Sequence, residues 1–167
     1  MKILVFSDTH GNPQFMQQAV KDHLAHGSVD MLIHLGDGWR DFAELQQKYP
    51  EIPSHAVKGN CDEWSASCKL PTSRIVEAEG LRFYLTHGHT THVKNDILNA
   101  ATGAAREKAD VLLYGHTHLS DDHREDTLYG RIRCINPGSA GAGFRPSYAV
   151  LELVQGQILC GFGSKTI

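Results

Sequence analysis

The sequence lacks a long apolar run, an excess of basic residues and closely spaced cysteine pairs, and each absence excludes a class of protein. The first apolar stretch ends at Phe6, far short of a signal peptide or a membrane span. The formal net charge of -3 argues against the broad basic surface of a nucleic-acid-binding domain. The four cysteines include no C-x-x-C pair, which argues against a zinc ribbon or a disulfide scaffold. We therefore expect a cytoplasmic protein with reduced thiols and with no membrane or stable nucleic-acid partner.

The residues that are present are typical of a globular domain. The 167 residues are 41% hydrophobic and 21% charged, which is enough apolar material for a substantial core. No linker, low-complexity segment or internal repeat divides the chain. We expect residues 1–167 to form a single domain.

The first half of the chain alternates short apolar runs with helical patterns. Residues 2–6 have the composition of a strand buried on both faces, and Asn12 follows as a helix N-cap with Pro13 in the first helical position. Further strands are expected at 31–35 and 54–57, with a second helical pattern between them. This alternation favours a sheet of parallel strands joined by helices.

The second half is richer in hairpins. Turn residues such as Glu79-Gly80 separate short β-like runs, which is typical of antiparallel pairs. The expected elements are hairpins over 74–85 and 122–135, a helix from about 93 to 108, a strand at 111–114, and two final strands at 148–154 and 157–160.

Metal-binding residue types gather in five short segments, each of which begins where an apolar run stops. Because the carboxyl ends of parallel strands form the ligand crevice of an open sheet, these segments can converge in space. Side chains of Asp, Asn and His suit Mn²⁺, Fe²⁺, Zn²⁺, Ni²⁺ or Co²⁺. Each segment alone also fits an ordinary turn, but five in this order point to one metal site. They are Asp8-Thr9-His10, Gly36-Asp37, Gly59-Asn60-Cys61-Asp62, His87-Gly88-His89 and Gly115-His116-Thr117-His118.

The five segments together resemble the signature of the calcineurin-like metallophosphoesterases. The short chain and the Gly-Asn-Cys-Asp sequence are most similar to the small YfcE-type phosphodiesterases of bacteria and archaea, as is the later run Asn136-Pro137-Gly138-Ser139. The resemblance implies an α/β protein, a four-layer α/β/β/α sandwich with two mixed β-sheets. It also implies a metal-dependent phosphoric ester hydrolase.

The resemblance further implies a position for each metal ligand. One cation would be held by Asp8, His10, Asp37 and His118, and the other by Asp37, Asn60, His87 and His116. We expect two divalent ions, with manganese as the first choice and nickel, iron, zinc or cobalt as alternatives. Two cations roughly 3.5–4 Å apart can hold a bridging hydroxide and neutralise the charge that develops on a phosphoryl group. The predicted reaction is attack of that hydroxide on a small phosphate diester or a nucleotide-like substrate.

The sequence does not assign the residue that protonates the leaving group. Cys61 stands where many members of the family have a histidine that is credited with this role. The thiol could donate a proton, or it could ionise or bind metal instead. His89 is a second candidate acid, since it neighbours a predicted ligand and has a reference pKa of about 6.5. A role in positioning the substrate fits His89 equally well. Asp62 is expected to orient a ligand or the catalytic loop.

Two alternatives stay open at this point. The same fold serves as a non-catalytic scaffold in a retromer subunit, so a metal-binding module for protein interaction is the competing function, although every expected ligand is present here. Trp39 and Trp64 follow motif segments and could line a cleft or simply pack the domain. Related enzymes often form dimers or tetramers, so the resemblance allows a homodimer or a homotetramer.

Overall fold

The computed structural model describes residues 1–141 and 145–164, and these form two mixed β-sheets. The order of the first sheet is β10 (Gln157–Ser164), β9 (Ser147–Val154), β1 (Lys2–Phe6), β2 (Met31–His34) and β3 (Ser54–Ala56). Strands β1, β2 and β3 run parallel, β9 pairs antiparallel with β1, and β10 pairs antiparallel with β9.

The order of the second sheet is β4 (Ser73–Ala78), β5 (Leu81–Thr86), β6 (Val111–Tyr114), β8 (Gly130–Pro137) and β7 (Ser120–Thr127). This sheet has a parallel centre and antiparallel edges. Strands β5, β6 and β8 are parallel, β4 pairs antiparallel with β5, and β7 pairs antiparallel with β8.

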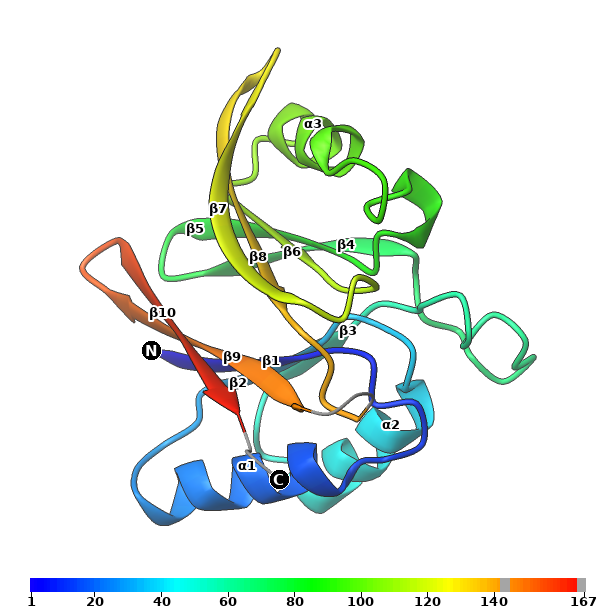
Figure 1. Ribbon diagram of the computed structural model, residues 1–167. Coiled ribbons are helices and arrows are strands. Elements are labelled where there is room, and N and C mark those ends of the chain that lie inside the picture. Colours follow the sequence, from blue (N-terminus) through cyan, green and yellow to red (C-terminus); the bar gives the residue numbers. More distant parts are fainter. Residues whose placement is uncertain (142–144, 165–167) are drawn as a thin grey trace.

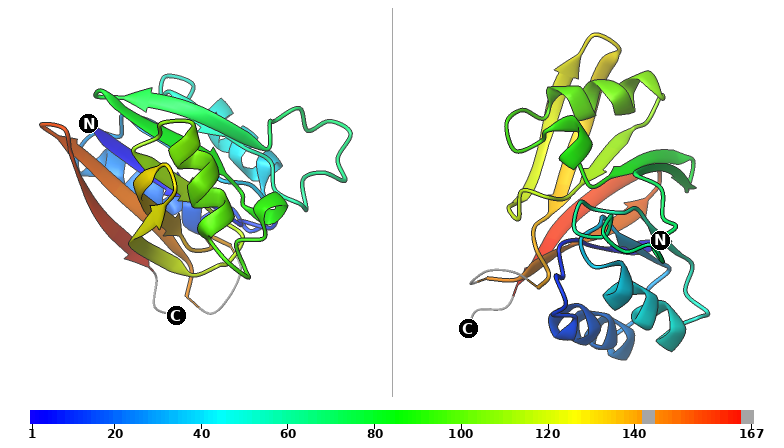
Figure 2. Two further views of the ribbon diagram at one scale, coloured as in Figure 1. Left: turned by 90° about the horizontal axis from the view of Figure 1, so that it is seen from above. Right: turned by 90° about the vertical axis from the view of Figure 1, so that its right-hand side faces the viewer.

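Helices cover the outer face of each sheet, as Figures 1 and 2 show. Helices α1 (Gln14–Ala25) and α2 (Trp39–Lys48) pack on the first sheet, and α3 (Leu98–Arg106) packs on the second. The side view in Figure 2 shows the resulting order of helices, sheet, sheet and helix. The predicted four-layer α/β/β/α sandwich with two mixed sheets is confirmed.

The alternation of side chains along β1 explains why two apolar layers form. Ile3 and Val5 point into the core between the sheets, whereas Leu4 and Phe6 point toward α1 and α2. Successive residues of a strand face opposite sides, so a strand that is covered on both sides must be apolar throughout. All four side chains are fully buried, and each contributes about 1.5–3 kcal/mol to stability by leaving water.

Two helix starts differ from those that the sequence predicts. Helix α1 begins at Gln14 with Pro13 as its N-cap and has no side-chain cap, and the Asn12 side chain donates to the carbonyl oxygen of His10 at 3.4 Å. Helix α3 begins at Leu98 and not near residue 93. His92 adopts a left-handed backbone conformation there, and Asp96 accepts a hydrogen bond from the Leu98 N–H.

The strand arrangement brings the loops after β1, β2, β3, β5 and β6 to one edge of the sandwich. The long connection from β3 to β4 projects from this edge, on the right of Figure 1. All four cysteines carry free thiols. Among the described residues there is no helix whose length and hydropathy would suit a membrane crossing.

Candidate metal centre

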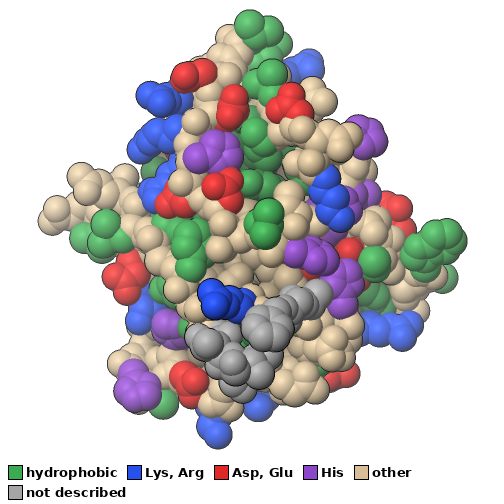
Figure 3. All heavy atoms as spheres, viewed as in Figure 1, with side chains coloured by type: hydrophobic (Ala, Val, Ile, Leu, Met, Phe, Trp, Pro, Cys, Tyr) green, Lys and Arg blue, Asp and Glu red, His purple; other side chains and the backbone are tan. Residues whose placement is uncertain are grey.

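Backbone hydrogen bonds fasten the motif loops to one another at the strand ends. The N–H of Asp8 donates to the Gly36 carbonyl oxygen at 2.9 Å, and the N–H of His10 donates to that of Asp37 at 3.0 Å. The Gly115 N–H donates to the His87 carbonyl oxygen at 3.2 Å. These bonds join segments that lie far apart in the sequence, and Figure 3 shows histidine side chains gathered on the right of the face drawn.

Asp8, His10 and His118 form the first group of possible ligands. The Oδ1 atom of Asp8 lies 3.0 Å from Nε2 of His118 and 3.6 Å from Nε2 of His10, and the two Nε2 atoms are 3.4 Å apart. Bonds of roughly 2.0–2.2 Å to a common ion place two ligand atoms roughly 3–4 Å apart. The spacing of these three atoms therefore fits one divalent cation.

Asp37, His87 and His116 form the second group, with ligand atoms that all lie within 4.8 Å of one another. Nδ1 of His87 donates to the Leu35 carbonyl oxygen at 2.7 Å, so Nε2 is the ring nitrogen that faces Asp37 Oδ2, 3.4 Å away. A hydrogen bond of this kind fixes the tautomer and the ring orientation of a metal-binding histidine. Asp37 Oδ2 also lies 3.9 Å from His10 Nε2, so one carboxylate lies between the two groups.

Unpaired polar atoms around these groups support the fit to metal ions. Within the described part of the chain, Asn60 Oδ1, His87 Nε2 and His89 Nδ1 are buried and have no hydrogen-bond partner. Buried polar atoms in folded proteins are almost always paired, and an orphan at a site calls for an ion or a ligand. Divalent cations would satisfy the acceptors on Asn60 and His87.

The electrostatics of the site keep the carboxylates charged. Burial alone would raise the pKa of Asp8, but the contacts with His10 and His118 hold it well below its usual range. Burial also opposes the charge on Asp37, yet the neighbouring His87 lowers the pKa of Asp37 to about 2. Burial lowers the pKa of His116 to about 4, so its imidazole is neutral at pH 7. The ionised carboxylates and the neutral His116 are thus in the forms that bind metal.

Five of the seven predicted ligands have a left-handed backbone. The φ angles are 56° for Asp8, 47° for His10, 57° for Asp37, 71° for His116 and 63° for His118. Residues with a Cβ rarely adopt this conformation, and such strain clusters at functional sites. Asp and His adopt it more often than most residues other than glycine, but the sequence does not single out these five positions.

Three polar residues that the sequence analysis did not assign to the site hold Asp8 and the His116 loop in place. Ser7 Oγ donates to Asp8 Oδ2 at 2.6 Å, and Ser139 Oγ donates to the Asp8 carbonyl oxygen at 2.8 Å. The fully buried Asn136 donates from Nδ2 to the Gly115 carbonyl oxygen at 3.0 Å. The sequence marks the run from Asn136 to Ser139 only through the family resemblance, and its polar residues are the signal that points to this role.

The three residues predicted to have catalytic roles lie in different environments. His89 begins the short 3₁₀ helix η1 (His89–Thr91), and its Nε2 is 3.3 Å from Glu63 Oε1. Cys61 is an exposed residue, but partial desolvation of its thiol, together with the nearby Asp37, raises the pKa of that thiol to about 11. Asp62 is buried and accepts four backbone N–H groups, those of Asp37, Gly38, Trp39 and Gly59. Its carboxylate therefore orders the loops that carry Asp37 and Asn60.

Gly59 packs so closely against Asp37 that a larger residue would displace the carboxylate. A Cβ at Gly59 would lie 2.1 Å from Asp37 Oδ1 and 2.5 Å from Asp37 N. We expect Gly59→Ala to lower the free energy of unfolding by about 1–3 kcal/mol, the range for overpacking, and to remove most of the rise in Tm that added metal produces.

Gly103→Ala is the matched control, because a Cβ there meets nothing within 4 Å and the residue lies inside α3. It should stabilise the protein slightly, by up to about 1 kcal/mol. Thermal unfolding with and without Mn²⁺ compares the two variants, and an unchanged metal response in Gly59→Ala would contradict the expectation.

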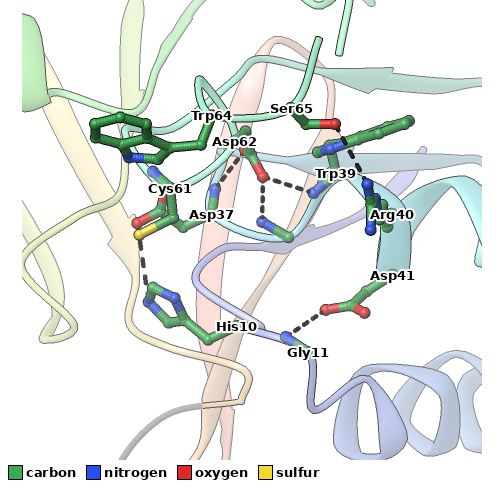
Figure 4. A pocket seen from close by; sticks show the side chains of 11 residues that line it. His10, Gly11, Asp37, Trp39, Arg40, Asp41, Cys61, Asp62, Trp64 and Ser65 are labelled. Atoms are coloured by element: carbon green, nitrogen blue, oxygen red, sulfur yellow. Dashed lines mark hydrogen bonds and ion pairs between the residues drawn. The ribbon is translucent and has the colours of Figure 1, made fainter. Parts of the chain in front are cut away.

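A cavity of about 380 Å³ opens beside the ligand groups (Figure 4). His10, Asp37 and Cys61 line it on the side of the candidate metal centre. Trp39, Arg40 and Trp64 complete its walls. The site is thus open to a molecule larger than water.

The sandwich with Asp, Asn and His gathered beyond its strand ends defines a class of α/β protein that binds metal at the strand ends. A family model of the calcineurin-like phosphoesterase superfamily domain matches residues 1–156. The chain belongs to this superfamily, as the five sequence segments predicted.

Two bacterial relatives extend the comparison. The probable metallophosphoesterase YsnB of Bacillus subtilis is 34% identical over 157 residues, which cover 92% of this chain and 85% of YsnB. Phosphodiesterase YfcE of Escherichia coli is 30% identical over 174 residues, with coverage of 91% and 88%. The predicted likeness to YfcE-type proteins is confirmed.

Two solved structures have a similar fold. A predicted phosphoesterase from Streptococcus pneumoniae superimposes with a TM-score of 0.76 at 26% identity, covering 96% of this chain and 87% of that one. Vps29 from Entamoeba histolytica, solved as a zinc complex, gives a TM-score of 0.70 at 21% identity, covering 98% and 99%. The likeness to Vps29 is one of fold alone.

Proposed function

We propose that the protein is a dinuclear metal-dependent phosphodiesterase that hydrolyses small phosphate diesters. The observation that carries the proposal is the position of Asp37, whose Oδ2 lies 3.9 Å from His10 Nε2 and 3.4 Å from His87 Nε2. A carboxylate between two groups of ligands suits a pair of cations that share it. The phosphodiesterase name of YfcE supports the choice of a diester substrate.

Each of the two groups of possible ligands would hold one cation, and Asp37 would belong to both. Asp8, His10, Asp37 and His118 would hold one ion, and Asp37, Asn60, His87 and His116 would hold the other. When bound, such ions withdraw charge from the phosphoryl oxygens and activate water near neutral pH. Manganese is our first choice, and nickel, iron, zinc and cobalt share the same ligand preferences.

The chain itself supplies orientation and proton transfer. Leu35 fixes the ring of His87 through its carbonyl oxygen, and Ser7 and Ser139 fix Asp8. His89 lies beside His87 and His116, with ring centroids 5.3 and 6.3 Å away, and is our candidate donor of the leaving-group proton. Cys61, whose raised pKa keeps the metal-free thiol protonated, is the second candidate.

Metal removal and return test the proposal. Protein stripped by a chelator should have a lower Tm and should not hydrolyse bis(p-nitrophenyl) phosphate. Two equivalents of Mn²⁺ per chain should restore activity, and free Mn²⁺ at 100 times Kd should stabilise the fold by about 2.7 kcal/mol per site. Binding of one ion per chain, or hydrolysis by the stripped protein, would contradict the dinuclear proposal.

The competing function is a metal-binding scaffold of the retromer-subunit type, which shares this fold. That function is favoured if the ions bind and raise Tm but bis(p-nitrophenyl) phosphate is not hydrolysed with Mn²⁺, Ni²⁺ or Zn²⁺. The same measurement therefore separates an enzyme from an interaction module.

His89→Ala tests the proton donor by comparing leaving groups. On methyl phenyl phosphate, whose leaving group needs a proton, we expect kcat to fall about 10²- to 10⁴-fold. On methyl p-nitrophenyl phosphate the loss should be much smaller, because p-nitrophenolate leaves readily without a proton.

His26→Ala is the control for this experiment, because His26 is exposed at the end of α1. It should leave both rates unchanged. Equal losses on the two substrates in His89→Ala would exclude His89 as the acid and would favour a role in positioning the substrate.

A further inference from the structure

The cavity beside the candidate metal centre has one wall from the loop after β3 and one from the start of α2. In Figure 4, Cys61 and Trp64 lie on one side of the cavity, and Trp39 and Arg40 lie on the other. A contact of 3.5 Å between Arg40 Nη2 and Ser65 Oγ joins the two walls.

The two tryptophans of the cavity are the only two in the sequence. The Trp64 side chain is 92% exposed. Neither indole belongs to any of the three hydrophobic clusters that the described residues form. An indole that leaves so much apolar surface in water, next to a cavity, offers a flat face to a ligand.

The charged groups of the cavity differ in the contacts that they make with the rest of the protein. Asp62 accepts four backbone N–H groups, and Asp41 accepts hydrogen bonds from Thr9 Oγ1 and the Gly11 N–H. Arg40, by contrast, forms no salt bridge within the described residues. Its guanidinium contacts Ser65 and lies 5.7 Å from the centre of the Trp39 ring. The cavity therefore offers aromatic surface and an available cation, which complements a planar ring with polar edges.

We propose that this cavity binds the aromatic base of a nucleotide-like substrate while the phosphate lies at the candidate metal centre. The base stacks on Trp64, and Trp39 with Arg40 forms the opposite wall. This inference rests on the proposed function, because the metal centre supplies the phosphate site. His10, Asp37 and Cys61 belong both to the cavity lining and to a cluster of possible ligand atoms, so a base and its phosphate can be bound side by side.

The size of the cavity suits a single nucleoside. A volume of about 380 Å³ is near the lower end of the range for small-molecule sites, about 300–1,000 Å³. Stacking on an indole is possible for every base, so we expect little preference among bases.

The test compares AMP with ribose 5-phosphate, which has the same phosphate and sugar but no base. Inhibition constants against bis(p-nitrophenyl) phosphate and quenching of tryptophan fluorescence measure binding to the metal-loaded protein. We expect AMP to bind at least about tenfold more tightly than ribose 5-phosphate, the effect of stacking one base. Trp64→Ala should remove most of this difference and leave ribose 5-phosphate binding within about twofold of the wild-type value.

Tyr129→Ala is the matched control, since Tyr129 is 58% exposed at the turn between β7 and β8, away from the cavity. It should keep the full preference for AMP. Equal binding of AMP and ribose 5-phosphate by a protein that still hydrolyses the diester with metal would overturn the inference alone, as would a preference that survives in Trp64→Ala. A protein with no metal-dependent hydrolysis would overturn the proposed function, and this inference with it.

Discussion

Asp37→Asn should reduce kcat/KM for bis(p-nitrophenyl) phosphate by at least about a thousandfold. Removal of a residue that only supports a metal ligand typically costs about 10- to 100-fold, and Asp37 is proposed to bind both ions directly. Asparagine is nearly isosteric and tolerates the φ of 57° at this position. Its side-chain oxygen can still accept the 2.7 Å hydrogen bond from the Cys61 N–H, so the fold should persist.

Metal titration followed by thermal unfolding separates the loss of binding from the loss of chemistry. The wild-type protein should gain Tm with Mn²⁺, and Asp37→Asn should gain much less. Asp126→Asn, on an exposed strand end of the second sheet, removes the same charge and should change neither activity nor metal response. Metal-dependent turnover within tenfold of the wild-type rate in Asp37→Asn would exclude a shared carboxylate.

The sequence alone was sufficient for the strands and for the loops that carry the candidate ligands. Asp8 and Asp37 each follow an apolar run covered on both faces, and the ends of such parallel strands meet at one edge. The uninterrupted apolar run of Ile3, Leu4 and Val5 indicates that both faces of the strand are covered, but it does not indicate which face meets a helix.

The features that cannot be predicted from the sequence depend on contacts between distant residues or on backbone conformation. Ser139 reaches the Asp8 carbonyl oxygen across 131 positions, and Asn136 joins the Gly115 loop. The left-handed backbone of Asp8 and His10 occurs at residues whose N–H groups bond to the loop after β2, a contact between distant parts of the chain. The late start of α3 follows from His92 and Asp96, where turn chemistry outweighs a helical pattern.

The second large effect concerns stability and follows from the four hydrogen bonds to Asp62. Its Oδ2 accepts from Asp37 N at 2.8 Å and Gly59 N at 2.9 Å, and its Oδ1 accepts from Gly38 N at 3.0 Å and Trp39 N at 3.1 Å. The carboxylate also lies at the N-terminus of α2, where the helix dipole favours a negative charge. Each buried donor left unpaired costs about 1–3 kcal/mol, although water can reach the donors on Gly38 and Trp39.

Asp62→Ala should therefore lower the free energy of unfolding by about 3–5 kcal/mol, a large share of the roughly 5–15 kcal/mol of a typical domain. Urea unfolding followed by circular dichroism should show a lower midpoint with an unchanged slope. Asp96→Ala is the matched control, since Asp96 accepts a single exposed hydrogen bond at the start of α3 and its loss should cost about 1 kcal/mol. The loss of stability in Asp62→Asn should lie between those of the two alanine variants, because its amide nitrogen cannot accept the N–H groups that one carboxylate oxygen now accepts. If Asp62→Ala were no less stable than Asp96→Ala, the Asp62 carboxylate would not be what orders the loops, and its burial would have to serve the reaction itself.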